Sequence, residues 1–451
     1  MSGERAFVLG LGVSGIAAAR LLKSEGTDVV VADMNDSPDL RRRAAELAAE
    51  GVEVLLGSHG IPPGAAALCV ASPGVPVDSA AVLAARQAGI PVIGELELAY
   101  RRCRCPLVAV TGANGKSTMV KLCGDVLRLA GLRVELGGNY GTPLSAIVPR
   151  SSELDWVVVE ASSFQLETAE HFRPRVGVLM NLQPNHLDRH PTIEAYRAAK
   201  ARMFARLGDG DCAVVHESQF ASFMRGASES ARQAQWIRFG TGPRCGFRYG
   251  GGQVSYRAGR VRQTVEVAGS YFGNEVLGST AAAAAAVAAA CGVRPELVGE
   301  AARQFVPLPH RMAQAATARG VRFIDDSKAT TLAAMAAGVT MAASPVRLIA
   351  GGLLKEHRLA SVKKVLASHV RAVYVIGHSA ARMERAWRDV VPCRRCDTLD
   401  VAVERAWEDA SPGETVLLSP GCASFDQFRG YADRGEQFCG HVAKVVRGVS
   451  P

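Results

Sequence analysis

The chain has 451 residues, of which 48% are hydrophobic, 21% are charged and 6% are aromatic. At about 150 residues per domain, this length predicts about three domains, each large enough for its own hydrophobic core. The apolar fraction excludes a disordered or collagen-like chain. The formal net charge is +9, but the basic residues are scattered, so we expect no nucleic-acid partner.

The cysteines and the apolar segments indicate the cellular setting. Eleven cysteines, an odd number without the spacing of a disulfide framework, predict a reduced, cytoplasmic protein. The apolar segment 7–19 is similar to the core of a signal peptide, but its glycine spacing favours a ligand-binding turn. The alanine-rich run 281–290 is too short to cross a bilayer and predicts a tightly packed helix. We expect no membrane insertion and a monomeric protein.

Three stretches alternate short apolar strands with helices, which predicts mostly parallel sheets. The first begins with a strand at 6–9, a helix at 16–24 and a strand at 28–32, and it ends near residues 95–100. Residues 235–268 are rich in Gly and Arg and predict a small antiparallel insert. The strands predicted in the second and third stretches are 107–110, 156–159, 176–179, 321–324, 346–350, 372–376 and 415–418.

These elements predict an α/β fold with three domains. We expect an N-terminal Rossmann-like domain at 1–98, a central P-loop ATPase-like domain at 99–305 and a C-terminal Rossmann-like domain at 306–451. Ligands of such sheets bind beyond the carboxyl ends of the strands, so the residues that follow the strands are the candidates for a site.

A glycine-rich turn follows the first strand. Gly10, Gly12 and Gly15 have the GxGxxG spacing, and Asp33 follows eighteen residues later. Such a turn lets backbone amides approach a diphosphate at a helix N-terminus, and the acid can accept a hydrogen bond from a ribose or a base. The pattern is compatible with a nicotinamide dehydrogenase, with any other diphosphate nucleotide, or with tight packing and no ligand.

A second glycine-rich turn, between the strand at 107–110 and a helix, is more specific. Its amides can cradle phosphates, Lys116 can reach the β and γ phosphates of ATP, and the Ser117 hydroxyl can bind Mg²⁺. Val110 stands where the usual P-loop pattern has its first glycine. The predicted ATP-binding residues here are Gly112, Asn114, Gly115, Lys116, Ser117 and Thr118.

Polar side chains follow the next two predicted strands of the second stretch. Glu160 comes directly after one strand, where a carboxylate can hold Mg²⁺ beside the P-loop. His186 and Asp188 follow the other strand and are expected to point towards the phosphates. Lys200 lies in an amphipathic helix, and its position alone indicates an exposed surface lysine.

The third stretch carries polar residues at both of its ends. His310, Arg311 and the segment 325–330 stand at its start, and the segment 419–428 follows its last strong strand. Strand ends rich in hydroxyls and amides, with one lysine, favour an anionic amino-acid substrate.

Taken in order, these residues resemble the Mur ligase family over nearly the whole chain. Within the family, the resemblance is strongest to the member that joins D-glutamate to UDP-N-acetylmuramoyl-L-alanine. The motifs that carry the resemblance are 10–15, 72–74, 94–97, 111–118, 137–139, 160–166, 181–190, 196–200, 308–311, 326–330 and 419–428.

The resemblance implies a role for each domain. The first would bind the UDP-sugar, with the diphosphate on the turn and the uracil near Asp33. The central domain would bind ATP and Mg²⁺, with Lys200 carbamylated to supply a carboxylate. The third would bind glutamate, while His310, Arg311 and Asp326 would join the ATP. The implied UDP-sugar residues are Gly12, Val13, Ser14, Asp33, Ser72, Gly74 and Asn139; the magnesium ligands Ser117, Glu160, His186 and Lys200; and the glutamate residues Lys328, Thr330, Lys355, Ser424 and Tyr431.

The resemblance implies an ATP-dependent amide ligase of peptidoglycan precursor synthesis that works through an acyl phosphate. Lys116, Glu160, His186 and Lys200 would be its catalytic residues. An L-glutamate-adding variant and a non-catalytic nucleotide or UDP-sugar binder are the alternatives, because the sequence departs from the family pattern. Asn185 replaces an Asp, Thr331 replaces an Asn, and the segment that would contact adenine has Asn274, Glu275 and Gly278 in place of His, Asn and Asn.

Overall fold

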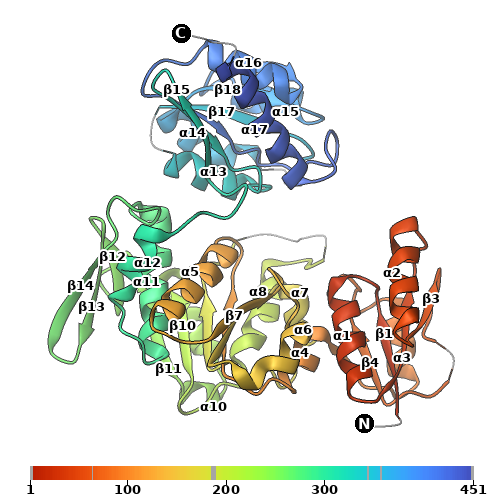
Figure 1. Cartoon of the computed structure of the whole chain (residues 1–451). Helices are drawn as coiled ribbons and strands as arrows, with labels where there is room; N and C mark the ends of the chain where they lie inside the picture. The colour runs from red at the N-terminus through yellow and green to blue at the C-terminus, as the bar shows by residue number, and fades with distance from the viewer. Residues whose placement is uncertain (1–3, 63, 184–188, 343–344, 356–357, 448–451) are drawn as a thin grey trace. The chain divides into compact units, whose positions relative to one another are not determined.

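The computed structural model describes residues 4–62, 64–183, 189–342, 345–355 and 358–447. Its contacts divide the chain into two compact units, one of residues 1–273 with 277–305, the other of 306–451 with 274–276. The first unit contains two sheets and the second contains one (Figure 1). The expected α/β fold is therefore confirmed.

The N-terminal sheet has five parallel strands in the order β3-β2-β1-β4-β5. Its central strands are continuous apolar runs, because helices on both faces bury them. The elements are β1 (Arg5–Leu9), α1 (Val13–Ser24), β2 (Asp28–Asp33), α2 (Pro38–Ala49), β3 (Glu53–Leu56), β4 (Leu68–Ala71), α3 (Ala80–Gln87), β5 (Val92–Gly94) and α4 (Glu95–Tyr100).

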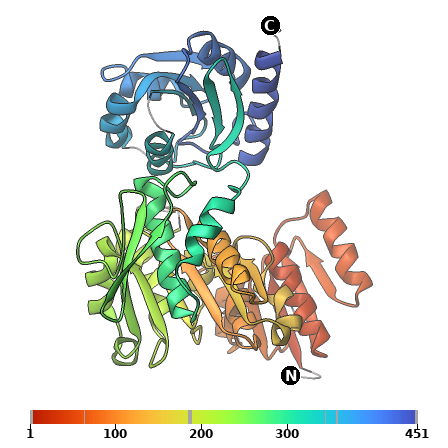
Figure 2. The same ribbon diagram turned by 60° about the vertical axis from the view of Figure 1, so that its left-hand side comes forward.

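The second sheet has nine strands in the order β14-β13-β12-β11-β10-β9-β6-β8-β7. Neighbouring strands among β6 to β12 pair in parallel. Strands β12, β13 and β14 form an antiparallel ribbon at one end of the sheet (Figures 1 and 2). The predicted antiparallel insert is thus an extension of this sheet. The strands are β6 (Leu107–Thr111), β7 (Val134–Gly138), β8 (Trp156–Glu160), β9 (Val176–Leu179), β10 (Cys212–His216), β11 (Gln235–Gly240), β12 (Phe247–Gly250), β13 (Gln253–Ala258) and β14 (Val261–Glu266).

Helices connect these strands, and the alanine-rich run lies in a buried one, α11, as expected. Small side chains let a helix approach its neighbours closely, and residues 281–288 are at most 1% exposed. The helices are α5 (Lys116–Leu129), α6 (Leu144–Ile147), η1 (Val148–Glu153), α7 (Ser163–Leu166), α8 (Ile193–Ala201), η2 (Arg202–Phe204), α9 (Glu217–Gly226), α10 (Glu229–Arg232), α11 (Glu275–Ala290) and α12 (Leu297–Gln304).

The sheet of the second unit has six strands in the order β15-β16-β20-β17-β18-β19, parallel except for β15. The carboxyl ends of β16, β20 and β17 therefore lie side by side. The elements are β15 (Ala313–Ala318), β16 (Val321–Asp325), α13 (Leu332–Met341), β17 (Val346–Gly351), η3 (Leu359–Val362), α14 (Lys363–His369), β18 (Val370–Ile376), α15 (Ala380–Trp387), β19 (Cys393–Asp397), α16 (Leu399–Glu408), β20 (Thr415–Leu418) and α17 (Tyr431–Arg447). In the described parts of the chain, every helix is too short or too polar to cross a bilayer.

Candidate active site

The phosphate loop joins β6 to α5. Gly115 has a φ of +82°, a left-handed conformation that favours glycine, and it caps the N-terminus of α5. At Gly112, a β-carbon would lie 3.0 Å from the Cβ of Met180, so a side chain there would press on the chain that follows β9. Ser117 and Thr118 are buried in the first turn of the helix. The loop thus has the shape that an anion site at a helix N-terminus requires.

Asn181, directly beyond β9, holds this loop in shape. Its Oδ1 accepts hydrogen bonds from the amides of Ala113 (3.0 Å) and Asn114 (2.9 Å), and its Nδ2 donates to the Asn114 carbonyl (3.0 Å). The Asn114 side chain in turn donates to Gln183. Asn181 was not among the predicted site residues. The sequence signal for Asn181 is its place at the end of a buried strand, in the segment 181–190 for which His186 was predicted as the functional residue.

Lys116 and Glu160 supply opposite charges at the loop. The Lys116 amine donates to the Ala113 carbonyl at 3.1 Å and so lies folded over the loop. Glu160, at the end of β8, is 3% exposed and accepts from the Ser117 hydroxyl (2.6 Å) and from Nδ2 of Asn139 (2.7 Å). A single carboxylate therefore joins the phosphate loop to the chain beyond β7.

Lys200 is buried, so the expectation of an exposed lysine from its helix alone is wrong. It is 1% exposed, and its amine donates to the Thr111 hydroxyl (3.1 Å) and the Gly112 carbonyl (3.0 Å). Burial, and then the nearby charge of Lys116, hold the pKa of the Lys200 amine well below its ordinary value. Burial thus favours the neutral form of an amine that lies directly behind the phosphate loop.

The predicted magnesium ligands are only partly described. Asn185, His186 and Asp188 lie outside the described residues. Among the residues that the structure does describe, no three His, Cys, Asp or Glu side chains converge on one point. The oxygen atoms available at the loop are those of Ser117 and Glu160, and such hard donors suit Mg²⁺.

A cavity of about 670 Å³ lies at the carboxyl end of the N-terminal sheet. It is large enough for a ligand well above the size of an amino acid. Its lining includes all seven residues expected to bind the UDP-sugar: Gly12, Val13, Ser14, Asp33, Ser72, Gly74 and Asn139. Asn139 also bonds to Glu160, the carboxylate that accepts from Ser117, so hydrogen bonds link the cavity lining to the phosphate loop.

The glycine turn at this cavity combines a tight contact with an open position. A β-carbon at Gly15 would collide with the Gly10 carbonyl and lie 2.8 Å from the Ser72 hydroxyl, whereas one at Gly12 would meet nothing within 4 Å. Asp33 accepts a hydrogen bond from the Leu11 amide at 2.8 Å. The turn is therefore fixed on its inner side and open towards the cavity.

In the second unit, four of the five residues expected to bind glutamate have defined neighbours at the strand ends. Lys328 donates to the Tyr431 hydroxyl at 3.1 Å, and the Thr330 amide bonds to the Lys328 carbonyl. Ser424 follows β20 and is 2% exposed, whereas Lys355 is exposed in the segment after β17. These two segments meet, because Leu353 and Ala423 exchange backbone hydrogen bonds.

Arg434, in α17, is a residue that sequence reasoning missed. It is fully buried and donates to the Ser327 hydroxyl and carbonyl and to the Cys422 carbonyl. It thus ties the segment containing Lys328 to the one containing Ser424. An arginine inside a predicted helix gives no sequence signal for such a role.

The second unit also holds His310, Arg311 and Asp326. His310 Nδ1 lies 2.7 Å from an oxygen of Asp325, and the partly buried Arg311 follows it in the chain. Asp326 accepts from the Ser419 hydroxyl, and burial raises its pKa to about 7 although that bond favours the carboxylate. Asp326 can therefore change charge near neutral pH.

The structure gives local reasons for three of the five departures from the family pattern. Gly278 packs in α11 against the ring of Tyr249, and any β-carbon there would collide with that ring. Asn274 Oδ1 accepts from the Val276 amide, as a helix-capping side chain does. The Thr331 hydroxyl caps α13 through the Ala334 amide. These residues thus suit the packing of this chain.

The sequence matches three family descriptions in order. Residues 4–94 match "Mur ligase MurD-like, N-terminal domain", residues 110–289 match "Mur ligase middle domain", and residues 310–422 match "Mur ligase, glutamate ligase domain". Two curated relatives are named UDP-N-acetylmuramoylalanine–D-glutamate ligase. The one from Acidobacterium capsulatum is 37% identical over 97% of this chain and 96% of its own length; the one from Nitratidesulfovibrio vulgaris (strain DP4) is 40% identical over 98% and 97%.

Solved structures share the fold at low sequence identity. A pseudomurein peptide ligase type C from Methanothermus fervidus superposes with a TM-score of 0.61 at 17% identity, covering 98% of this chain and all of its own. The MurF ligase of Thermotoga maritima, in complex with ADP, gives 0.61 at 16% identity over 93% of this chain and 95% of its own.

Proposed function

Because the chain belongs to the Mur ligase family, we propose that it is an ATP-dependent ligase that adds D-glutamate to UDP-N-acetylmuramoyl-L-alanine. The observation that carries the proposal is the position of Glu160. Its carboxylate bonds at once to Ser117 of the phosphate loop and to Asn139 of the cavity. A substrate that fills the cavity would therefore bring its far end to the terminal phosphate of ATP.

The UDP-sugar would lie in the cavity of the first unit. Its diphosphate would rest on the open side of the turn at Gly12, Val13 and Ser14, and its uracil near Asp33. Ser72 and Gly74 would line the path of the sugar, and the alanine carboxylate would reach Asn139. This arrangement uses the cavity along its length and leaves the reacting carboxylate beside the phosphate loop.

The reaction would proceed in two steps. The alanine carboxylate attacks the γ-phosphorus of ATP, ADP leaves, and the amine of glutamate then displaces phosphate from the resulting acyl phosphate to give the amide. The loop amides at 112–118 bind the phosphates, and Lys116 neutralises the charge that develops during transfer. Water must be excluded, because an acyl phosphate hydrolyses readily.

Magnesium fits the residues at the loop. Ser117 and Glu160 offer a hydroxyl and a carboxylate 2.6 Å apart, and a bound Mg²⁺ would neutralise phosphate charge. Lys200 would become a further ligand as a carbamate: its neutral amine attacks the carbon of CO₂, forming an N–C bond and releasing one proton. The lowered pKa supports this step, because only the neutral amine is a nucleophile. His186 would complete the ligands.

The second unit would bind glutamate. Lys328 and Lys355 supply positive charge for its carboxylates, while Thr330, Ser424 and Tyr431 offer hydroxyls. His310, Arg311 and Asp326 would contribute to ATP binding. We assign residues 1–98 to the UDP-sugar, 99–305 to ATP and 306–451 to glutamate. We also propose that the protein is a cytoplasmic monomer; the compartment, though not the monomeric state, is in keeping with eleven free cysteines.

Phosphate release from ATP tests the proposal. We expect release only when both UDP-N-acetylmuramoyl-L-alanine and D-glutamate are present, with the amide product detected by mass spectrometry. L-glutamate in place of D-glutamate tests the alternative amino-acid substrate. Binding of both nucleotides without any phosphate release would support a non-catalytic relative instead.

A further inference from the structure

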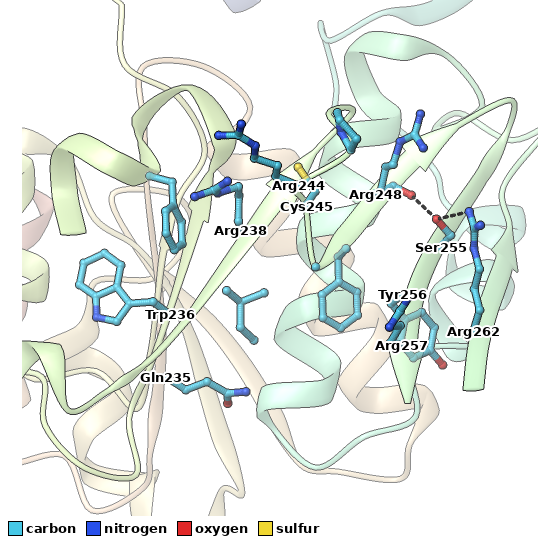
Figure 3. A pocket seen from close by; sticks show the side chains of 15 residues that line it. Gln235, Trp236, Arg238, Arg244, Cys245, Arg248, Ser255, Tyr256, Arg257 and Arg262 are labelled. Atoms are coloured by element: carbon cyan, nitrogen blue, oxygen red, sulfur yellow. Dashed lines mark hydrogen bonds between the residues drawn. The ribbon is translucent and has the colours of Figure 1, made fainter. Parts of the chain in front are cut away.

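A second cavity, of about 620 Å³, lies within the first unit at the β12–β14 ribbon (Figure 3). Strand β11 pairs with β12 only at Phe239 and Gly240, so the earlier part of β11, Gln235 to Arg238, is not paired with β12 and forms one wall. None of the individual residues proposed to contact ATP, the UDP-sugar or glutamate lines it. We call it the arginine pocket, after Arg238, Arg244, Arg248, Arg257 and Arg262.

All charged residues that line the arginine pocket are positive. Its lining contains five arginines and no acidic residue. Among the described residues, no carboxylate lies within ion-pair distance of these five, although other arginines of this unit are paired: Arg173 and Arg175 both contact Asp211. The nearby Glu217 bonds instead to the amides of Thr241 and Gly242. Gathering unpaired like charges in a concave site is unfavourable without an anion.

Two of these arginines occupy directly opposite positions on neighbouring antiparallel strands. Arg257 of β13 is paired in register with Arg262 of β14, and like charges directly opposite in a sheet are destabilising. Arg248 and Ser255 form the adjacent pair on the same face, and Ser255 accepts a hydrogen bond from Arg262 (Figure 3). Arg248, Arg257 and Arg262 therefore extend from one face of the ribbon.

Arg238 provides charge on the opposite wall. Its guanidinium lies 4.3 Å from the ring centroid of Phe220, and its buried Nε has no hydrogen-bond partner among the described residues. Figure 3 shows Arg238 and Trp236 on one side of the pocket and Arg248 and Arg262 on the other. A buried N–H without an acceptor is rare in proteins. Because this Nε is covered, Arg238 would act on a ligand in the pocket through the charge of its guanidinium.

We propose that the arginine pocket binds a small polyanion that carries phosphate groups. Arginine presents a planar fork of donors that matches phosphate oxygens in pairs, and two facing walls suit a ligand with more than one charged group. A volume of about 620 Å³ lies within the usual range of small-molecule sites. This inference does not depend on the proposed ligase activity.

Calorimetric titration of the full chain with inorganic tripolyphosphate tests the proposal, with hydrogen–deuterium exchange locating the bound probe. The variant is Arg244→Gln with Arg257→Gln, because both side chains are exposed. We expect the variant to bind about tenfold or more weakly, and protection of residues 235–262 to disappear. Equal affinity in the two proteins, or protection confined to 111–118, would overturn the proposal.

Matched controls distinguish binding in the arginine pocket from a general effect of lost positive charge. Arg371→Gln with Arg388→Gln removes the same charge from exposed positions in the second unit, and tripolyphosphate should bind it as it binds the wild type. An equal loss there would refute a specific site. Arg244→Lys with Arg257→Lys keeps the charge and should lose part of the affinity, because lysine lacks the fork.

Two further probes define the ligand class. Citrate, a polyanion without phosphate, should bind more weakly than tripolyphosphate; equal binding would refute the phosphate requirement. A single-stranded oligonucleotide that bound more tightly than tripolyphosphate, and lost that affinity in the Gln variant, would identify a nucleic-acid surface instead and overturn the small-molecule proposal.

Discussion

The two glycine-rich turns of the first unit share a strand–turn–helix topology but are stabilised in different ways. The turn between β1 and α1 is fixed by a carboxylate, since Asp33 accepts the Leu11 amide. The turn between β6 and α5 is fixed by a neutral amide, Asn181, and carries Lys116. The first turn thus offers a phosphate only backbone dipoles beside a negative residue, whereas the second offers a full positive charge. The first suits binding without reaction, and the second suits phosphoryl transfer.

The largest effect that would test this contrast comes from Lys116→Ala. We expect kcat to fall about 100- to 1000-fold, because a charge aimed at the transferring phosphate is lost, while UDP-sugar affinity stays unchanged. Phosphate release and calorimetry measure the two effects. Lys121→Ala is the control, since Lys121 lies in the same helix and pairs with Asp125. An equal loss of UDP-sugar affinity would show that the loop serves a different ligand.

Lys200→Arg tests whether Lys200, behind the turn between β6 and α5, acts as a carbamate. Arginine keeps a positive charge but cannot form a carbamate, so activity should fall about 10- to 100-fold, as when metal sites lose supporting groups. Lys200→Ala should be similarly impaired. Added bicarbonate should raise the activity of a CO₂-depleted wild type and leave both variants unchanged. Wild-type activity in the arginine variant would reject the carbamate.

Gly15→Ala and Gly12→Ala compare the two sides of the first turn. The Gly15 variant should lose about 1–3 kcal/mol of stability through overpacking against Gly10 and should bind the UDP-sugar weakly. The Gly12 variant has room for its methyl group and should keep its Tm. Thermal unfolding and calorimetry measure both properties, and equal melting temperatures would contradict the packing argument.

Asp33→Asn should have the smallest effect. The amide oxygen can still accept the Leu11 amide, but the NH₂ group cannot accept the Asn35 amide that the other oxygen of Asp33 accepts at 2.9 Å. The charge and one hydrogen bond on the protein are therefore lost, a change of about 1 kcal/mol. UDP-sugar affinity should fall about fivefold and the KM for ATP should stay constant. A rise in the KM for ATP would mean that the two turns do not act separately.

Local patterns were sufficient to predict both glycine turns and the central strands around them, whereas the residues Ser72, Gly74 and Asn139 of the cavity came from the family resemblance. The turn at Gly10, Gly12 and Gly15 joins a strand directly to a helix, so it is a local structure. The cavity residues up to Gly74 lie at the carboxyl ends of β1, β2 and β4, which meet at one edge of the N-terminal sheet, whereas Asn139 follows β7 of the second sheet. Lys116 and Ser117 were predictable for the same reason, because the phosphate loop is a local structure.

The features that could not be predicted depend on contacts between distant segments. Lys200 is buried because its helix packs behind Thr111, 89 residues earlier in the chain. Arg434 supports Ser327 from a helix 107 residues away. Gly278 packs directly against the ring of Tyr249, which leaves no space for a side chain. An asparagine there would therefore displace that ring rather than restore a contact to adenine. Periodicity carries no information about such pairs.

The shared carboxylate of Glu160 has a thermodynamic consequence. A ligand at the phosphate loop that draws this carboxylate away from Ser117 also changes the hydrogen bond to Asn139, and a ligand in the cavity that engages Asn139 changes the bond to Ser117. Linkage is reciprocal, so each substrate must alter the affinity for the other by the same factor. The pair of hydrogen bonds on one side chain is therefore a direct route for cooperativity between nucleotide and sugar.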